Sequence, residues 1–152
     1  RFDQRGMPDG EAKTRFEEYF AVFPWENLPK EAEGFDMGCG TGRWARWVAP
    51  KVHKLHCIDP SDAIKVAEIN LSDHENVSFY QASLDTECLP SGSQDFGYSL
   101  GVLHHVPDTE AASETSTKFA AQVSIAYSKL AAVGTAELPE GAFSVPCCGC
   151  RK

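Results

Sequence analysis

The chain has 152 residues, of which 42% are hydrophobic and 24% are charged, and its formal net charge is −8. This composition predicts one globular domain rather than a disordered or fibrous chain. The excess of acidic groups argues against a nucleic-acid partner, because affinity for the phosphate backbone comes from Lys and Arg. The sequence has neither a run of about 18 apolar residues nor a signal-like N-terminus, so we expect no membrane contact and a cytoplasmic location.

Residues 1–33 are expected to form an N-terminal helix and a connector. The aromatic residues Phe16, Tyr19, Phe20 and Phe23 have the spacing of one helical face, and Pro24 ends the pattern. We favour a helix that packs on the domain; the alternative is a lid over a substrate.

Strand-like and helical segments alternate between residues 34 and 112. Such alternation predicts an α/β domain, with a parallel sheet and helices on both faces. The expected elements are a strand from Gly34 with Phe35 and Met37 inward, a helix at Arg43–Ala49, a strand at Lys54–Ile58, a helix with Ser61 at its N-cap and Ile64, Ala67 and Leu71 on one stripe, and strands at Val77–Gln81 and Asp95–Leu100.

A glycine-rich turn, residues 38–42, joins the first strand to its helix. Glycine suits a sharp turn at which the backbone comes close to a ligand. The spacing GxGxG differs from the dinucleotide pattern GxGxxG, whose third glycine would fall at Arg43. A domain of an NAD-binding dehydrogenase is therefore a less favoured alternative, and a purely structural turn is another.

Two carboxylates lie beside this turn in the predicted fold. Asp59 ends the second strand 17 residues after Gly42, where a carboxylate can accept hydrogen bonds from both hydroxyls of a ribose. The alternative for Asp59 is an acid that interacts with a helix dipole. Asp36 lies inside the first strand and needs donors or a cation nearby. A positively charged ligand would supply that cation.

The segment from Asp36 to Gly42 resembles motif I of class I S-adenosylmethionine-dependent methyltransferases, and Asp59 lies where the ribose-binding acid of that family ends the second strand. Residues 82–90 and 95–108 are similar to the family's segments around the third and fourth strands. The resemblance covers about residues 33–112. It implies a doubly wound, Rossmann-like fold with strand order 3-2-1-4.

The resemblance also implies a cofactor, S-adenosylmethionine, and an activity, methyl transfer to an unidentified small or medium-sized acceptor. Where the family often has Asp, this chain has Ser83, and Asp85 is the nearest substitute. His104 and His105 fit a structural hydrogen-bonding element better than a base, so no catalytic residue is assigned. The implied cofactor-binding residues are Asp36 near the ammonium group, Gly38, Cys39, Gly40 and Gly42 along the methionine portion, Asp59 with Pro60 at the ribose, Ser83 and Leu84 at the adenine, and Leu100 and Gly101 beneath the sulfonium.

Residues 113–152 differ from the rest of the chain. They carry 4 basic and 3 acidic side chains, against 10 basic and 19 acidic side chains in residues 1–112, and are rich in Ala, Ser and Thr. We expect one helix at about Glu110–Ala132 and none of the family's C-terminal strands, which would leave the fourth strand at a sheet edge. Since the chain also begins with Arg1, an inactive, cofactor-binding fragment is the main alternative function.

The cysteines predict no metal site. Cys147 and Cys150 have CxxC spacing, but a structural zinc site needs four ligands and no others lie near them in the sequence. Cys39, Cys57 and Cys88 are expected to be buried, reduced thiols.

Overall fold

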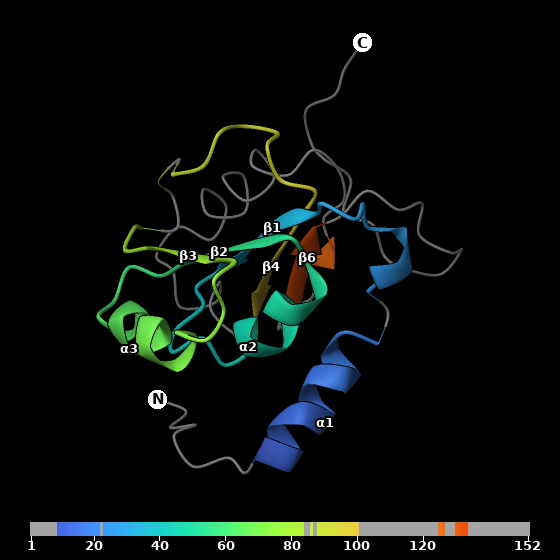
Figure 1. Cartoon of the computed structure of the whole chain (residues 1–152), viewed down its shortest axis with the longest axis horizontal. Coiled ribbons are helices and arrows are strands. Elements are labelled where there is room, and N and C mark those ends of the chain that lie inside the picture. Colours follow the sequence, from blue (N-terminus) through green and yellow to red (C-terminus); the bar gives the residue numbers. More distant parts are fainter. Residues whose placement is uncertain are drawn as a thin grey trace.

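The computed structural model describes residues 9–21, 23–83, 86, 88–100, 125–126 and 130–133 of the chain. These residues form a six-stranded sheet in the order β3-β2-β1-β4-β6-β5 (Figure 1). Strands β1 to β4 are parallel, whereas β6 is antiparallel to both β4 and β5. The strands are β1 (Glu33–Met37), β2 (Lys54–Ile58), β3 (Val77–Tyr80), β4 (Phe96–Leu100), β5 (Ile125–Ala126) and β6 (Leu130–Val133).

The helices of the described part of the chain pack together on one face of this sheet. They are α1 (Asp9–Tyr19), α2 (Ala45–Val48) and α3 (Ala63–Asn70), with short 3-10 turns η1 (Trp25–Asn27) and η2 (Ala49–Lys51). Apolar side chains from all three helices form one cluster with Leu55, Cys57, Phe96 and Tyr98 of the sheet. On the other face Phe35, Met37 and Ile58 are fully buried as well. The central strands β1, β2 and β4 are therefore buried on both faces, whereas β3 at the edge is half-buried throughout.

The pairing of β1 with β4 is fixed by two aromatic rings that lie against glycines. Gly34 is the register partner of Phe96, and Phe35 is the register partner of Gly97. A Cβ on Gly34 would lie 2.2 Å from the ring of Phe96, and a Cβ on Gly97 would lie 2.1 Å from the ring of Phe35. This register brings the next residue of β1, Asp36, opposite Tyr98.

The predicted order 3-2-1-4 of parallel strands is confirmed. The bounds of β2 agree with the prediction, and those of β1, β3 and β4 differ from it by about one residue. The predicted stripe on α3 is buried, at Ile64, Ala67 and Leu71. The hydroxyl of Ser61 accepts a hydrogen bond from the N–H of Ala63 at 3.2 Å, although the N-cap position itself is Asp62.

The N-terminal helix differs from the prediction in its bounds. It begins at Asp9 and ends at Tyr19, so Phe20 and Phe23 follow the helix instead of extending it. Both side chains are still buried: the ring of Phe20 lies 5.2 Å from that of Tyr98, and the ring of Phe23 lies 5.5 Å from that of Phe96. Since the aromatic face contacts the sheet, the favoured interpretation of a helix packed on the domain is confirmed.

Two expectations for the C-terminal region are wrong. Strands β5 and β6 continue the sheet beyond β4, so β4 is not at its edge (Figure 1). The helix expected at Glu110–Ala132 is a strand at the described positions 125–126 and 130–132. Alanine has the highest intrinsic helix propensity, but tertiary contacts routinely override such a preference, and the N–H and C=O groups along the free side of β4 offer a neighbouring segment hydrogen bonds that outweigh it.

The cysteines agree only in part with the expectation that Cys39, Cys57 and Cys88 are buried. Cys39 and Cys57 are buried free thiols, whereas Cys88 is only half-buried. The His, Cys, Asp and Glu side chains of the described residues form no cluster of metal-binding character. None of the described helices combines the length and the apolar content needed to cross a bilayer.

Candidate functional site

The glycine-rich loop lies at the carboxyl end of β1. Gly38, Gly40 and Gly42 have φ values of 78°, 55° and 80°, in the left-handed region that side chains disfavour. The N–H groups of Gly38 and Cys39 both donate to the carbonyl of Ile58, at 2.7 and 3.1 Å. The loop is thereby joined to the end of β2. The sharp turn predicted from the glycine spacing is present.

Two glycines of this loop have different surroundings. A Cβ on Gly42 would lie 2.8 Å from Cδ1 of Leu71 and 3.3 Å from Cβ of Ala67, so this glycine allows α3 to pack closely. A Cβ on Gly40 would meet no atom within 4 Å. The backbone at Gly40 therefore borders open space, and this is where a ligand can approach the chain.

Asp59 connects the loop to the start of α3. The carboxylate is 7% exposed, and its Oδ2 accepts a hydrogen bond from the N–H of Gly40 at 2.8 Å. Its Oδ1 accepts two, from the N–H of Ser61 at 2.9 Å and from the hydroxyl of Ser61 at 2.6 Å. A carboxylate has about four acceptor positions, so roughly one remains, on Oδ2.

Asp36 is the most deeply buried carboxylate at this edge, with 1% of its surface exposed. It lies between Cys57 of β2 and Tyr98 of β4, its register partners on either side. Its Oδ2 has no hydrogen-bond partner, and the hydroxyl of Tyr98 has none either.

The charge of Asp36 depends on these surroundings. Burial raises the pKa of its carboxyl to about 8, the nearby Tyr98 phenol offsets part of the rise, and the charge of Asp59 adds to it. With nothing bound, the carboxyl therefore holds a proton near neutral pH. A cation beside it would favour the ionised form.

Cys39 belongs to the same loop, but its thiol does not have the character of a nucleophile. Hydrogen bonding to Cys57 and burial raise the pKa of Cys39 far above its usual range. Its Sγ lies 3.7 Å from the carbonyl oxygen of Gly40. Because only a thiolate is strongly nucleophilic, Cys39 can contribute its backbone and its shape to the site.

The remaining predicted residues are distributed along the carboxyl edge of the sheet. Pro60 and Ser83 are exposed, after β2 and β3. Leu100 ends β4 and belongs to the buried cluster that contains Tyr98. Parallel strands place all their carboxyl ends at one edge, which brings the loop, Asp36 and Asp59 together. Five residues named in the sequence analysis lie outside the described residues: Leu84, Asp85, Gly101, His104 and His105.

Sequence reasoning missed Tyr98 as part of this site and assigned Ser61 only to a helix cap. Tyr98 was expected in a strand, but only the register of β1 with β4 places its ring beside Asp36. A signal for Ser61 was present, since an Asp side chain commonly accepts a hydrogen bond from the backbone N–H two residues further on, as Asp59 does from Ser61.

The sequence profile of the methyltransferase domain family matches residues 35–122, more than half of the chain. The chain belongs to this family. The suspected resemblance to class I S-adenosylmethionine-dependent methyltransferases is confirmed. The match continues past residue 112, where the resemblance was expected to end.

Solved structures with the same fold are only distantly related in sequence. YcgJ of Bacillus subtilis is 21% identical, with 73% of this chain and 46% of YcgJ covered and a TM-score of 0.61. A SAM-dependent methyltransferase of Aquifex aeolicus is 17% identical, with 76% of this chain and 68% of that protein covered and a TM-score of 0.57. The [4+2]-cyclase SpnF is 18% identical, with 78% of this chain and 44% of SpnF covered and a TM-score of 0.65.

At these identities the comparisons establish the fold. The chain covers 46% of the length of YcgJ. It covers 48% of a putative methyltransferase of Bacillus halodurans, with a TM-score of 0.64, so it spans about half the length of both proteins. The comparison with curated proteins gives no match.

Proposed function

We propose that this chain binds S-adenosylmethionine at the carboxyl edge of β1, β2 and β4, and that it belongs to an enzyme that transfers the methyl group to a small or medium-sized acceptor. The observation that carries the proposal is the buried Oδ2 of Asp36, which has no hydrogen-bond partner and lies at the start of the glycine loop. A carboxylate in this position calls for a cationic ligand. When bound, S-adenosylmethionine supplies an activated methyl group on a positively charged sulfonium.

In this proposal different residues of the carboxyl edge contact different parts of the cofactor. Asp36 faces the positively charged methionine end, and the backbone around Gly40 lies along that portion because a Cβ there would point into open space. Asp59 accepts a ribose hydroxyl. The other proposed contacts follow the family resemblance: Gly38, Cys39 and Gly42 along the methionine portion, Pro60 at the ribose, Ser83 and Leu84 at the adenine, and Leu100 and Gly101 beneath the sulfonium.

The hydrogen bonds of Asp59 refine its proposed contact with the ribose. Three acceptor positions are used by Gly40 and Ser61, which leaves about one, on Oδ2. Asp59 therefore accepts one ribose hydroxyl while it keeps the loop in place, unless the bond from Gly40 opens. The Asp59 side chain therefore both holds the glycine-rich loop in place and contacts the ligand.

Methyl transfer from a sulfonium depends mainly on position. The enzyme must hold the acceptor atom in line with the methyl carbon and keep water away, and these effects do not require a strong base. We therefore propose no catalytic base among the described residues. An acceptor other than nucleic acid is supported by the net charge of −8.

A second candidate is cofactor binding without methyl transfer. Two observations favour it: the chain spans about half the length of several solved relatives, and one protein with this fold is a [4+2]-cyclase. Both candidates predict S-adenosylmethionine binding. They differ in whether S-adenosylhomocysteine is formed when candidate acceptors are supplied.

Calorimetric titration tests the proposed cofactor. We expect S-adenosylmethionine and S-adenosylhomocysteine to bind and NAD not to bind. Asp59→Ala removes one charge-assisted hydrogen bond to the ribose, worth about 1.5–3 kcal/mol, so the dissociation constant should rise about 10- to 150-fold. The matched control is Asp62→Ala, which removes the same charge from an exposed side chain three residues further on.

Tight NAD binding without detectable S-adenosylmethionine binding would overturn the cofactor assignment. An unchanged dissociation constant in a folded Asp59→Ala variant would overturn the ribose contact alone. The two results separate the identity of the cofactor from the role of one residue.

A further inference from the structure

A second buried polar side chain without a hydrogen-bond partner lies beside Asp36. Tyr98 of β4 is the register partner of Asp36, and both residues are 1% exposed. The hydroxyl of Tyr98 and Oδ2 of Asp36 each lack a hydrogen-bond partner. A hydroxyl buried in this way costs free energy, so its place next to an ionisable group requires an explanation.

The two groups influence each other's ionisation. Burial raises the pKa of the Asp36 carboxyl to about 8, and the phenol of Tyr98 offsets part of this rise. Burial also raises the pKa of Tyr98 well above its usual range, and the charge of Asp36 adds to that rise. The Tyr98 hydroxyl therefore keeps its proton at neutral pH and can donate it to an acceptor.

The ring of Tyr98 is held in place by its surroundings. The ring of Phe20 meets it edge-on, with the two centres 5.2 Å apart, and both residues belong to the buried cluster between the helices and the sheet. Because packing fixes the ring, the position of the hydroxyl is set before a ligand arrives. A hydrogen bond from it then has a small entropic cost.

The other titratable groups that act on Asp36 are poor donors to a carboxylate. The charge of Asp59 raises the pKa of Asp36, and its own oxygens already accept three hydrogen bonds. Cys57 is the register partner of Asp36 on β2, and Cys39 hydrogen-bonds with it. A thiol is a weak donor. Of these described groups, Tyr98 is therefore the one with a hydroxyl to donate.

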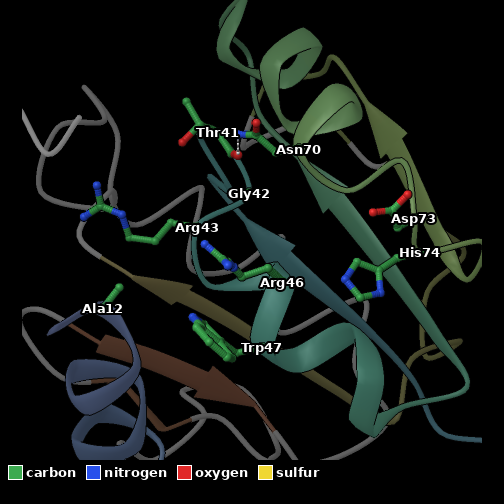
Figure 2. A pocket seen from close by; sticks show the side chains of 9 residues that line it. All are labelled: Ala12, Thr41, Gly42, Arg43, Arg46, Trp47, Asn70, Asp73 and His74. Carbon is green, nitrogen blue, oxygen red and sulfur yellow. Dashed lines mark hydrogen bonds between the residues drawn. The ribbon is translucent and has the colours of Figure 1, made fainter. Parts of the chain in front are cut away.

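The loop that follows Asp36 is fixed from its far side. Figure 2 shows that side, where the side-chain amide of Asn70 donates to the carbonyl of Thr41 at 3.0 Å. Gly42 packs there against Leu71 without a Cβ between them. A ligand at the loop thus meets a backbone that is already in place, and the group that must change on binding a cation is the Asp36 carboxyl.

We propose that Tyr98 is a positioning residue of the cofactor site, whose hydroxyl donates a hydrogen bond to the Asp36 carboxylate when a cationic ligand is bound. This role rests on the proposed function, because it needs a cation at Asp36. On binding, the Asp36 carboxyl releases its proton to solvent, the cation faces the carboxylate, and the phenol donates to it. A hydrogen bond to an ionised acceptor is about twice as strong as one between neutral groups, so Tyr98 favours the ionised form. Tyr98 acts through Asp36 and makes no contact with the cofactor.

The first test measures the titration of Asp36 in the full chain by NMR of its carboxyl carbon, without cofactor. Tyr98→Phe removes the hydroxyl and keeps the ring, so the pKa of Asp36 should rise above its wild-type value of about 8. The matched control is Tyr80→Phe, which removes a phenol hydroxyl from β3 that is hydrogen-bonded to Nδ1 of His56 at 3.1 Å. This control should leave the titration of Asp36 unchanged.

The second test compares the affinity for S-adenosylmethionine at pH 7 and pH 9 by calorimetry. At pH 7 the dissociation constant of Tyr98→Phe should exceed that of the wild type about tenfold or more. At pH 9 the ratio should be much smaller, because Asp36 is then largely ionised in the wild-type chain without help from the ligand. A purely structural effect would give the same ratio at both pH values. In an Asp36→Asn background, Tyr98→Phe should have little further effect.

The role of Tyr98 is refuted if the folded Tyr98→Phe variant leaves the Asp36 titration unchanged, or if its affinity ratio is the same at pH 7 and pH 9. Should the variant not fold, as judged by circular dichroism, the wild-type chain decides. The ring carbon that bears the Tyr98 hydroxyl should then shift with the same midpoint as Asp36, and an independent midpoint refutes the role. Absence of S-adenosylmethionine binding to the wild-type chain is a different result, because it refutes the proposed function itself.

Discussion

Asp36 has two properties that oppose each other while the site holds no ligand. It is a carboxylate, which water would keep ionised at neutral pH, yet it is 1% exposed and its Oδ2 has no hydrogen-bond partner. Burial therefore raises its pKa to about 8. A cationic ligand reverses the balance, because a charge pair offsets part of the cost of burying each charge. We therefore expect Asp36 to favour a cationic ligand over a neutral one.

The affinity for S-adenosylmethionine should accordingly depend on pH. Below about pH 8 the empty site holds a proton on Asp36, and that proton must leave when a cation binds. The dissociation constant should rise about tenfold for each pH unit below about 8. Titration calorimetry at pH 6, 7 and 8 measures this slope. In Asp36→Asn the binding should be weaker at pH 8 and nearly independent of pH; a wild-type slope in that variant would contradict the role of Asp36.

The same carboxyl should affect the stability of the ligand-free protein. Its pKa is raised from 3.8 to about 8, so between these values the folded state binds more protons than the unfolded state. The contribution of this carboxyl to the free energy of unfolding is therefore fully present at low pH, and it is lost as the pH rises toward about 8. Asp36→Asn should remove this decrease. Urea unfolding at pH 5 and pH 8 checks the pKa separately from any effect on the ligand.

At the scale of single residues, the sequence identified both carboxylates but not their partners. Asp36 stood out because a carboxylate inside a strand needs a partner, and Asp59 because it ends a strand. The neighbour Tyr98 follows from strand register, which no local pattern contains. The three hydrogen bonds that Asp59 accepts follow from the fold of the loop over β2. Residue types were thus predictable, and contacts between segments were not.

The glycine loop is the element that links packing to the proposed site. Gly42 and Gly40 both have positive φ, so a side chain at either position strains the backbone. Their surroundings differ: Gly42 faces Leu71, whereas Gly40 faces open space. Gly42 is needed because α3 packs closely against the loop, and Gly40 leaves room for a ligand.

Substitution of these two glycines by alanine should separate stability from binding. Gly42→Ala adds a close contact to the backbone strain and should lower the free energy of unfolding by about 2–5 kcal/mol. Gly40→Ala adds strain alone, about 1–2 kcal/mol, and places a methyl group in the proposed cofactor space. We therefore expect Gly40→Ala to weaken S-adenosylmethionine binding more than Gly42→Ala does, although it unfolds less easily in urea. The reverse order for binding would show that the ligand does not approach Gly40.

The N-terminal helix shows where a spacing rule stops being reliable. The aromatic pattern continues to Phe23, and it predicted a helix ending at Pro24. The chain instead leaves the helix after Tyr19, and Phe20 and Phe23 reach Tyr98 and Phe96 from a turn. The spacing identified which residues are buried. It could not fix where the helix ends, because a turn can present two side chains to the same surface.

At the scale of the whole molecule, the alternation of strands and helices predicted the parallel order 3-2-1-4, but the pairing beyond β4 could not be predicted. The glycines, the turns and the spacing of apolar residues in residues 34–100 act locally, so the sequence pattern contains them. Strand β6 pairs with β4 from Leu130↔Leu100 to Val133↔Gly97, about 30 residues away in the sequence. A short, alanine-rich strand has little local signal, and its partner supplies most of its stability.

The last prediction concerns this edge. A chain ending at residue 124 lacks β5 and β6, so the N–H and C=O groups of β4 that face β6 lose their partners. These groups then exchange with water or pair with another molecule. We expect rapid hydrogen exchange at alternate amides of Phe96–Leu100, with the amides bonded to β1 still protected, together with self-association on size-exclusion chromatography with light scattering. The matched control ends at residue 133 and keeps both strands, so it should resemble the full chain. Equal protection of β4 and equal mass in the two shortened chains would mean that β6 contributes nothing to closing the sheet, and β4 would then be its edge in solution.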